Sequence, residues 1–169
     1  VRSGRWAERK KYNGIGLKNK IVGSIGLGRI AREFFSIAKP LDIVPIAYDP
    51  FCSAEKAEEL GIKLVDLKTL LKTSDFVCIN CPLEDTTFHL IGERELSLMK
   101  PTAFLINTSR GQIIDQKALT IALQKKLIQG AALDVFEQEP LSLNDPLTQL
   151  DNVILSPHAL AWTDELFKG

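Results

Sequence analysis

Short apolar runs rich in β-branched residues alternate along the chain with longer stretches in which apolar positions follow a helical spacing. This alternation predicts an α/β fold, in which a doubly wound parallel sheet lies between two layers of helices. The predicted strands cover residues 20–25, 43–48, 62–65, 76–80, 103–107, 131–135 and 153–155. The predicted helices cover residues 28–39, 54–60, 66–72, 92–99 and 115–126.

Residues near the ends of these elements indicate where the elements begin and stop. We expect Ser53 and Asp115 to cap the N-termini of their helices, because their side-chain oxygens can accept hydrogen bonds from free N–H groups. Gly61 and Gly130 are expected to end the preceding helices. Pro45 lies inside the second predicted strand and removes a backbone donor. We therefore expect a bulge there, or a strand that begins one residue later.

The segment after the first predicted strand carries a G-x-G-x-x-A motif that opens a helix. Gly26 allows a tight turn, Gly28 lets the backbone approach a pyrophosphate, and Ala31 lets the helix pack closely on its strand. The helix N-terminus offers free N–H groups and partial positive charge to phosphates. Asp49 ends the second predicted strand, where a carboxylate would hydrogen-bond a ribose 2′-hydroxyl and repel a 2′-phosphate. The motif therefore predicts a Rossmann fold that binds NAD rather than NADP.

Length and composition are those of one ordinary globular domain. The chain has 169 residues, of which 45% are hydrophobic and 25% charged. Because 21 basic residues balance 21 acidic ones, no overall field recruits nucleic acid or an anionic membrane. Residues 1–20 hold seven Lys or Arg against one acidic residue. We interpret this stretch as a solvated arm or helix rather than a nucleic-acid site, since it contains few aromatic residues.

Neither a membrane segment nor a metal site is predicted. No apolar run approaches the roughly 20 residues that span a bilayer, and no apolar stretch follows the basic N-terminus as in a signal peptide. Three cysteines, an odd number, are typical of a reduced, cytoplasmic protein. Cys78 and Cys81 have C-x-x-C spacing, but along one strand they would face opposite sides of the sheet. The chain offers no second pair and only 2 histidines.

Polar residues follow four of the predicted strands, at the sheet edge where doubly wound proteins bind ligands. Residues 80–87 fit two interpretations, a cofactor contact or a cluster that caps a following helix. Arg110 has the planar fork that suits a carboxylate, although most arginines are surface charges. Asp134 lies in an apolar run, where an ionised carboxylate needs hydrogen-bond donors. Pro140 holds Glu139 in an extended or turn conformation.

Two histidines and a second glutamate complete the set of candidate residues. His158 follows the last predicted strand and fits either a general acid–base role or a satisfied boundary position. His89 is interpreted as a packing or solvent-exposed residue, and Glu137 as simply solvated. Taken together, Arg110, Glu139 and His158 would form one site beside a nicotinamide cofactor, with an arginine for a carboxylate and a histidine that the glutamate orients.

These motifs together resemble the nucleotide-binding domain of the D-isomer-specific 2-hydroxyacid dehydrogenases, the group that contains phosphoglycerate dehydrogenase and glyoxylate/hydroxypyruvate reductase. The resemblance covers essentially the whole chain and rests on motifs that occur in the family's order. The motifs are residues 1–6, 22–30, 107–111, 133–136 with 139–140, and 156–158.

The resemblance implies that NAD is the cofactor and that Arg110, Glu139 and His158 are the catalytic residues. The residues implied to contact the cofactor are Gly26, Gly28, Arg29, Ile30, Asp49, Cys81, Pro82, Thr87, Thr108 and Asp134. Of these, Arg29 and Ile30 match residues beside the pyrophosphate. Thr108 and Asp134 match residues near the nicotinamide.

The implied reaction is hydride transfer between C4 of the nicotinamide and C2 of a D-2-hydroxy acid or 2-oxo acid. Arg110 would hold the substrate carboxylate, His158 would give or take the proton, and Glu139 would favour the charged imidazole. Two alternatives stay open. One is an NAD(H)-responsive binding or corepressor module, because the family also includes transcriptional corepressors. The other is oxidation of a related small anion, such as formate or phosphite, on the same scaffold.

Members of the family also have a second, substrate-contacting domain, which the resemblance does not find here. We expect an entry arm or linker helix at residues 1–19, an NAD-binding Rossmann domain at 20–158 and the start of a truncated C-terminal segment at 159–169. Such a chain is expected to bind NAD(H) but to reduce 2-oxo acids poorly, because one wall of a water-excluding cleft is missing. By resemblance, a homodimer would form through the NAD-binding domain, near Arg5 and Trp6.

Overall fold

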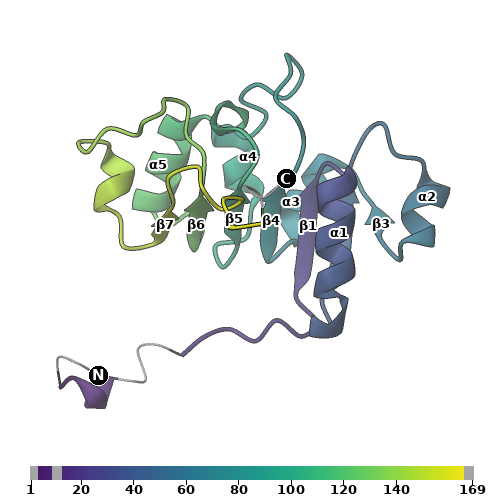
Figure 1. Ribbon diagram of the computed structural model, residues 1–169, viewed down its shortest axis with the longest axis horizontal. Coiled ribbons are helices and arrows are strands. Elements are labelled where there is room, and N and C mark those ends of the chain that lie inside the picture. The colour runs from purple at the N-terminus through teal and green to yellow at the C-terminus, as the bar shows by residue number, and fades with distance from the viewer. Residues whose placement is uncertain (1–3, 9–12, 166–169) are drawn as a thin grey trace.

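Parallel strands form one seven-stranded sheet in the structure, a computed structural model that describes residues 4–8 and 13–165 (Figure 1). The spatial order of these strands is β3-β2-β1-β4-β5-β6-β7. They are β1 (Ile21–Ile25), β2 (Val44–Tyr48), β3 (Lys63–Leu64), β4 (Phe76–Ile79), β5 (Phe104–Asn107), β6 (Gly130–Leu133) and β7 (Val153–Leu155). The predicted strands are confirmed, with small differences at their ends.

Helices cover the two faces of the sheet and complete the predicted three layers. They are α1 (Arg29–Ala38), α2 (Ala54–Glu59), α3 (Leu67–Thr73), α4 (Glu93–Leu98) and α5 (Gln116–Gln124). Short 3₁₀ turns are η2 (Lys39–Leu41), η3 (Gly111–Ile113) and η4 (Pro146–Gln149). No helix in the described ranges has both the length and the apolar character needed to cross a membrane.

Two apolar clusters attach the helices to the sheet. On one face, Ala31 and Phe35 of α1 pack with Ala57 of α2 against β1 and β2. On the other face, the apolar sides of α3, α4 and α5 pack against the central strands, with Leu70 and Leu119 fully buried. Burial of this apolar surface is the main source of stability for such a layered fold.

Most of the predicted helix boundaries agree with the structure. Ser53 and Asp115 each accept a hydrogen bond from the N–H group three residues on, as expected of N-caps. Gly61 follows α2 with a φ of +70°, so this predicted stop is confirmed. The predicted stop at Gly130 is wrong, because that residue begins β6. Helix α5 ends earlier, and Lys126 adopts the left-handed conformation, with a φ of +54°.

The predicted bulge or late start at Pro45 is also wrong. Strand β2 pairs with β1 in unbroken parallel register, with Pro45 opposite Val22. The Val44 N–H group donates to the carbonyl of Lys20, so the Pro45 nitrogen points away from β1. On that other side, β3 pairs only from Ile46 onward. The proline therefore removes no hydrogen bond from the sheet.

The strand order reverses between β1 and β4, and this point positions the candidate site. The chain winds from β1 toward β3 on one side and from β4 toward β7 on the other. In doubly wound sheets, ligands bind outside the carboxyl ends of the strands at such a reversal. The turn after β1 and the segment after β4 meet there, since a Cβ added to Gly26 would lie 2.8 Å from the Cys81 nitrogen.

Candidate active site

The glycine turn after β1 leaves the N-terminus of α1 accessible. Gly26 has a φ of +92°, in the left-handed region that favours glycine. Gly28 caps α1 without a side-chain hydrogen bond, and a Cβ added there would meet nothing within 4 Å. Arg29 and Ile30, in the first turn of α1, are exposed. The free N–H groups of this turn can therefore receive an anion such as a pyrophosphate.

Asp49 lies just beyond the carboxyl end of β2 and is tied to the glycine turn. One carboxylate oxygen accepts a hydrogen bond from the Leu27 N–H group at 2.7 Å, and the other accepts one from the Phe51 N–H group at 2.8 Å. Each oxygen keeps further acceptor capacity. The carboxylate is thus held in place beside the turn and can still accept hydrogen bonds from a ribose.

A buried polar network that was not predicted from the sequence lies beneath the glycine turn. Ser24 is fully buried in β1, and its hydroxyl donates to the carbonyl of Gly26 at 2.6 Å. The side-chain amide of Asn80 in turn donates to the Ser24 hydroxyl at 2.9 Å. The network ties the turn after β1 to the end of β4. The position of Ser24 in an otherwise apolar strand was the feature of the sequence that could have predicted this network.

The segment after β4 is a loop shaped by its own side chains. The Thr87 hydroxyl donates to the carbonyl of Pro82 at 2.7 Å and accepts from the Glu84 N–H group at 2.8 Å. The Cys81 carbonyl accepts from the hydroxyl of Ser109, after β5, at 2.6 Å. The segment leads into turns rather than directly into a helix. The interpretation of this segment as a helix-capping cluster is therefore wrong.

Arg110 extends from the loop after β5. The buried side chain of Asn107 ends that strand, and its amide donates to the Arg110 carbonyl at 2.9 Å. The Arg110 guanidinium is exposed and donates to the carbonyl of Ser109 at 2.7 Å. Thr108 is exposed beside it. Because β5, β6 and β7 are neighbours in the sheet, the segments that follow them emerge at one edge.

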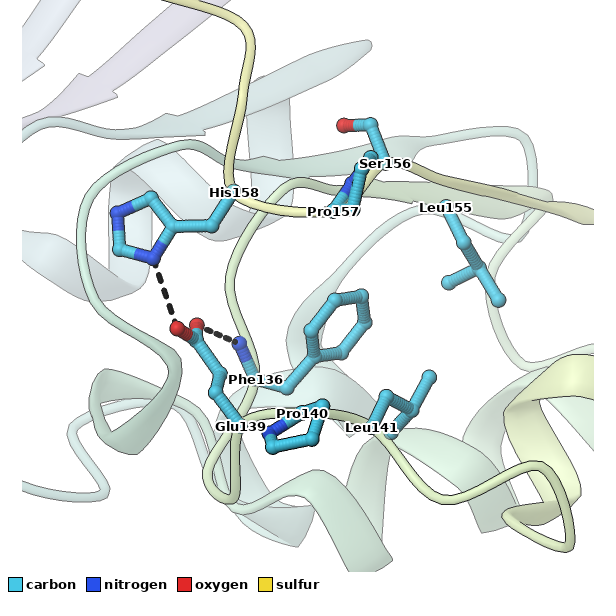
Figure 2. Close-up of a pocket in the computed structure, with 8 residues that line it drawn as sticks. All are labelled: Phe136, Glu139, Pro140, Leu141, Leu155, Ser156, Pro157 and His158. Carbon is cyan, nitrogen blue, oxygen red and sulfur yellow. Dashed lines mark hydrogen bonds and ion pairs between the residues drawn. The ribbon is translucent and has the colours of Figure 1, made fainter.

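His158 and Glu139 form a hydrogen-bonded pair at this edge (Figure 2). The distance between His158 Nδ1 and Glu139 Oε2 is 2.8 Å, while Glu139 Oε1 accepts from the Phe136 N–H group at 3.0 Å. The hydrogen bond from His158 holds the pKa of Glu139 below its ordinary value. With Nδ1 bound to a carboxylate, Nε2 is the ring nitrogen that can exchange a proton with a ligand.

Asp134 anchors the chain around His158. It is 5% exposed, and its carboxylate accepts hydrogen bonds from the Ser156 hydroxyl and from the N–H groups of Ala159 and Leu160. Burial alone would raise the pKa of Asp134, but these hydrogen bonds together outweigh it and keep that pKa below its ordinary value. The expectation that this buried carboxylate needs donors is confirmed. His158 itself has a φ of +55°, a conformation that this anchoring maintains.

An apolar cavity of about 340 Å³ lies beside the pair of His158 and Glu139 (Figure 2). Its other lining residues are Phe136, Pro140, Leu141, Leu155, Ser156 and Pro157. These side chains come from the loop after β6 and from the end of β7, so both segments that carry the pair line the cavity.

The interpretation of Glu137 as a solvated residue is wrong, and His89 has a partner. His89 Nε2 lies 2.7 Å from Glu137 Oε1, and the side chains are only 37% and 33% exposed. The same carboxylate oxygen accepts from the backbone N–H group of Gln116, the first residue of α5. The His89 ring also stacks on Phe88, with centroids 4.1 Å apart. The residues that neighbour His89 and Glu137 in the sequence do not predict this contact.

The cysteines do not form a metal site. Cys52, Cys78 and Cys81 are free thiols. Burial raises the pKa of Cys78 to about 12 and that of Cys81 to about 11, so both stay protonated near neutral pH. In the part of the chain that the structure describes, no group of three or more His, Cys, Asp or Glu side chains could hold a metal ion.

Comparison with known proteins agrees with this fold. A family model described as "D-isomer specific 2-hydroxyacid dehydrogenase, NAD binding domain" matches residues 1–159. The chain is 45% identical over 165 residues to a D-3-phosphoglycerate dehydrogenase of Archaeoglobus fulgidus, covering 98% of this chain and 31% of that protein. It is 45% identical over 175 residues to a glyoxylate reductase of Thermococcus litoralis, covering 100% of this chain and 53% of that protein.

Solved structures show the same architecture. A glyoxylate reductase from Paecilomyes thermophila superposes with a TM-score of 0.88 at 34% identity, covering 99% of this chain and 50% of the other. Another similar structure is the NAD complex of a D-isomer specific 2-hydroxyacid dehydrogenase from Lactobacillus delbrueckii ssp. bulgaricus. It superposes with a TM-score of 0.81 at 32% identity, covering 91% of this chain and 50% of the other.

The fold and the glycine turn define a dinucleotide-binding domain of the Rossmann type. The chain belongs to the D-isomer-specific 2-hydroxyacid dehydrogenase family, as its NAD-binding domain. It spans between about a third and about half of the length of the curated relatives named above.

Proposed function

We propose that this chain binds NAD(H) and supplies the proton-transfer pair of an oxidoreductase that interconverts D-2-hydroxy acids and 2-oxo acids. The observation that carries the proposal is the 2.8 Å hydrogen bond between His158 and Glu139. This hydrogen bond and the glycine turn after β1 both lie at the carboxyl edge of the same sheet. A protonatable imidazole beside a dinucleotide site is the arrangement that reduction of a carbonyl requires.

The chemistry of the donors around the sheet edge fits NAD. The pyrophosphate would lie on the N–H groups at Gly26 and Gly28, beside Arg29 and Ile30. Asp49 would accept from the adenosine ribose. The remaining contacts that the family resemblance supports are Cys81, Pro82, Thr87, Thr108 and Asp134. Bound NADH would supply the hydride, from C4 of its nicotinamide to C2 of the substrate.

Three side chains would handle the substrate. Arg110 binds the carboxylate through two parallel hydrogen bonds, a geometry that lysine cannot reproduce. His158 donates a proton from Nε2 to the carbonyl oxygen during reduction and removes it during oxidation. Glu139 keeps the ring oriented through Nδ1 and stabilises the imidazolium by its negative charge.

The names of the relatives favour this function over the alternatives. They are phosphoglycerate dehydrogenase and glyoxylate reductase, so an enzyme of 2-hydroxy and 2-oxo acids is better supported than a corepressor-like sensor or an enzyme that oxidises formate or phosphite. We propose that residues 20–158 form the cofactor-binding domain, between an arm at 1–19 and a connecting segment at 159–169. The second wall of the substrate cleft would come from sequence outside these 169 residues.

Calorimetric titration of the chain with NADH and with NADPH tests the cofactor assignment. We expect NADH to bind much more tightly, because the Asp49 carboxylate accepts from a ribose hydroxyl and repels a 2′-phosphate. Asp49→Asn should weaken NADH binding about tenfold or more, as expected for the loss of a charged hydrogen bond, and should strengthen NADPH binding. The exposed Asp151→Asn is the matched control and should change neither affinity. Equal affinity of the unmodified chain for the two cofactors would overturn the assignment.

We further propose that the chain forms a homodimer through this domain, in the cytoplasm. Three side chains on the outer side of α1 and η2 support the dimer: Phe34, Ile37 and Leu41 are 40%, 71% and 51% exposed. Trp6 is 64% exposed. Such exposed apolar surface is typical of an interface. The free cysteines support a reducing compartment.

Sedimentation velocity tests the dimer. The unmodified chain should sediment as a dimer, and Ile37→Glu should sediment as a monomer, because the new carboxylate would be buried without a partner. Ser36→Glu adds the same charge at an exposed neighbouring position on α1 and should remain dimeric. A monomer at every concentration of the unmodified chain would refute the interface.

A further inference from the structure

The loop after β6 carries two glutamates, and each is paired with one of the 2 histidines of the chain. Glu139 pairs with His158 at 2.8 Å, and Glu137, two residues earlier, pairs with His89 at 2.7 Å. Both histidines adopt positive φ values, +55° for His158 and +49° for His89. Non-glycine residues keep this conformation only where surrounding contacts hold it. The proposed mechanism uses the first pair and leaves the second without a role.

Glu137 is hydrogen-bonded through its backbone as well as its side chain. Its N–H group donates to the side-chain oxygen of Gln116 at 3.1 Å, and its carbonyl accepts from the side-chain amide of Gln112 at 3.0 Å. Its carboxylate accepts from the Gln116 N–H group at 3.1 Å and contacts His89. These partners lie in η3, at the start of α5 and in the segment before α4. Glu137 thus fixes the loop to two elements and to the segment before α4.

The residue before Glu137 links this part of the loop to Glu139. The N–H group of Phe136, the preceding residue, donates to Glu139 Oε1 and closes a short turn. The backbone of Phe136 also packs against Gly111 so closely that a Cβ there would lie 1.9 Å from the Phe136 carbonyl carbon. Any movement of Glu137 would therefore move the turn that presents Glu139 to His158.

His89 has its own backbone support. Its N–H group donates to the carbonyl of Gln112 at 2.9 Å, and the neighbouring Ile91 pairs with residues 113 and 114. The imidazole is thus presented to Glu137 from a segment that is itself tied to η3. The contact between the two side chains joins the segment after β4 to the loop after β6.

We propose that His89 and Glu137 are a positioning pair, which holds the loop at residues 135–140 so that Glu139 stays in contact with His158. The pair itself touches neither substrate nor cofactor. The inference rests on the proposed function, because it gives the pair a role only through Glu139 and His158.

The titration of Glu139 in the 169-residue chain tests this proposal without substrate or cofactor. The Glu139 carboxyl carbon can be followed by NMR and assigned by its loss in Glu139→Gln. His158 lowers the pKa of Glu139, and the nearby Asp134 raises it. In Glu137→Ala we expect the pKa of Glu139 to rise toward its ordinary value as the contact with His158 is lost. Removal of a neighbouring negative charge alone would lower that pKa, so the sign separates the two causes.

Conservative variants provide the matched controls. Glu137→Gln also removes the charge but keeps the acceptor oxygen, and it should leave the pKa of Glu139 at or below that of the unmodified chain. Gln138→Ala, on an exposed residue between the two glutamates, should leave that pKa unchanged. Far-UV circular dichroism would show which variants fold.

A second pair of variants keeps the test decisive where Glu137→Ala does not fold. In His89→Asn, the asparagine tolerates a positive φ but is too short to reach Glu137. In His89→Gln, the glutamine is uncharged like asparagine, but its longer side chain can still reach Glu137. We expect the pKa of Glu139 to rise in His89→Asn and to stay unchanged in His89→Gln. The proposal is overturned if the folded Asn variant titrates like the unmodified chain. That outcome would leave NADH binding untouched, so it is distinguishable from failure of the proposed function.

Discussion

His158→Ala is expected to abolish the reduction of 2-oxo acids while NADH affinity survives. General acid catalysis by a positioned side chain contributes about 10²- to 10⁴-fold to a rate, so kcat should fall by at least that range. The cofactor contacts proposed here lie mainly at the glycine turn, at Asp49 and after β4. The imidazole contributes to none of them, and its loss should therefore leave the dissociation constant of NADH unchanged.

The measurement requires the chain joined to a substrate-binding domain, because we expect these 169 residues alone to reduce 2-oxo acids poorly. Steady-state rates with glyoxylate and a panel of larger 2-oxo acids would be compared at saturating NADH. Leu160→Ala is the matched control, since that side chain is 61% exposed and only its backbone N–H group contacts Asp134. Turnover by His158→Ala equal to that of the unmodified enzyme would remove His158 from the mechanism.

Gly111→Ala should be among the most destabilising single substitutions in the domain. A Cβ at this position would lie 1.9 Å from the carbonyl carbon and 2.0 Å from the carbonyl oxygen of Phe136. Both atoms belong to the backbone, so no side-chain rotation relieves the overlap. Overpacking typically costs about 1–3 kcal/mol and occasionally more, and we expect the upper part of this range. Because the loop that carries Glu139 must move away, its contact with His158 should be lost as well.

Urea denaturation of the chain would measure this effect. Gly16→Ala provides the control, because a Cβ there meets nothing within 4 Å. Its free energy of unfolding should stay within about 0.5 kcal/mol of the unmodified chain, as is usual for surface substitutions. If Gly111→Ala unfolds at the same urea concentration as Gly16→Ala, the close packing of η3 on this loop is not a feature of the protein in solution.

Local patterns in the sequence were enough to predict the elements and their order. The alternation of strands and helices, the caps at Ser53 and Asp115, and the turn at Gly26 depend on residues close together in the chain. Such features follow from backbone conformation and side-chain periodicity, which neighbouring residues determine. The parallel, doubly wound sheet follows from the order of the elements, because crossover connections between parallel strands have a fixed hand.

Two predictions of where an element breaks were wrong, because the position of a neighbouring element decided the outcome. Pro45 is harmless because its nitrogen faces the side on which β3 has not yet begun to pair. Gly130 begins a strand because the α5 helix has already ended, near Lys126. In each case the residue type suggested a break, and the arrangement of the surrounding elements decided whether one occurs.

By itself, the sequence determined the fold class, the glycine turn and the segments that could carry chemistry. Only the tertiary structure decided how Glu139 meets His158, how Asp134 anchors that histidine, and that Glu137 pairs with His89. The physical reason is the range of the forces involved. Hydrophobic periodicity and turn conformation act between near neighbours, whereas hydrogen bonds between distant residues form only after the strands have brought their carboxyl ends to one edge of the sheet.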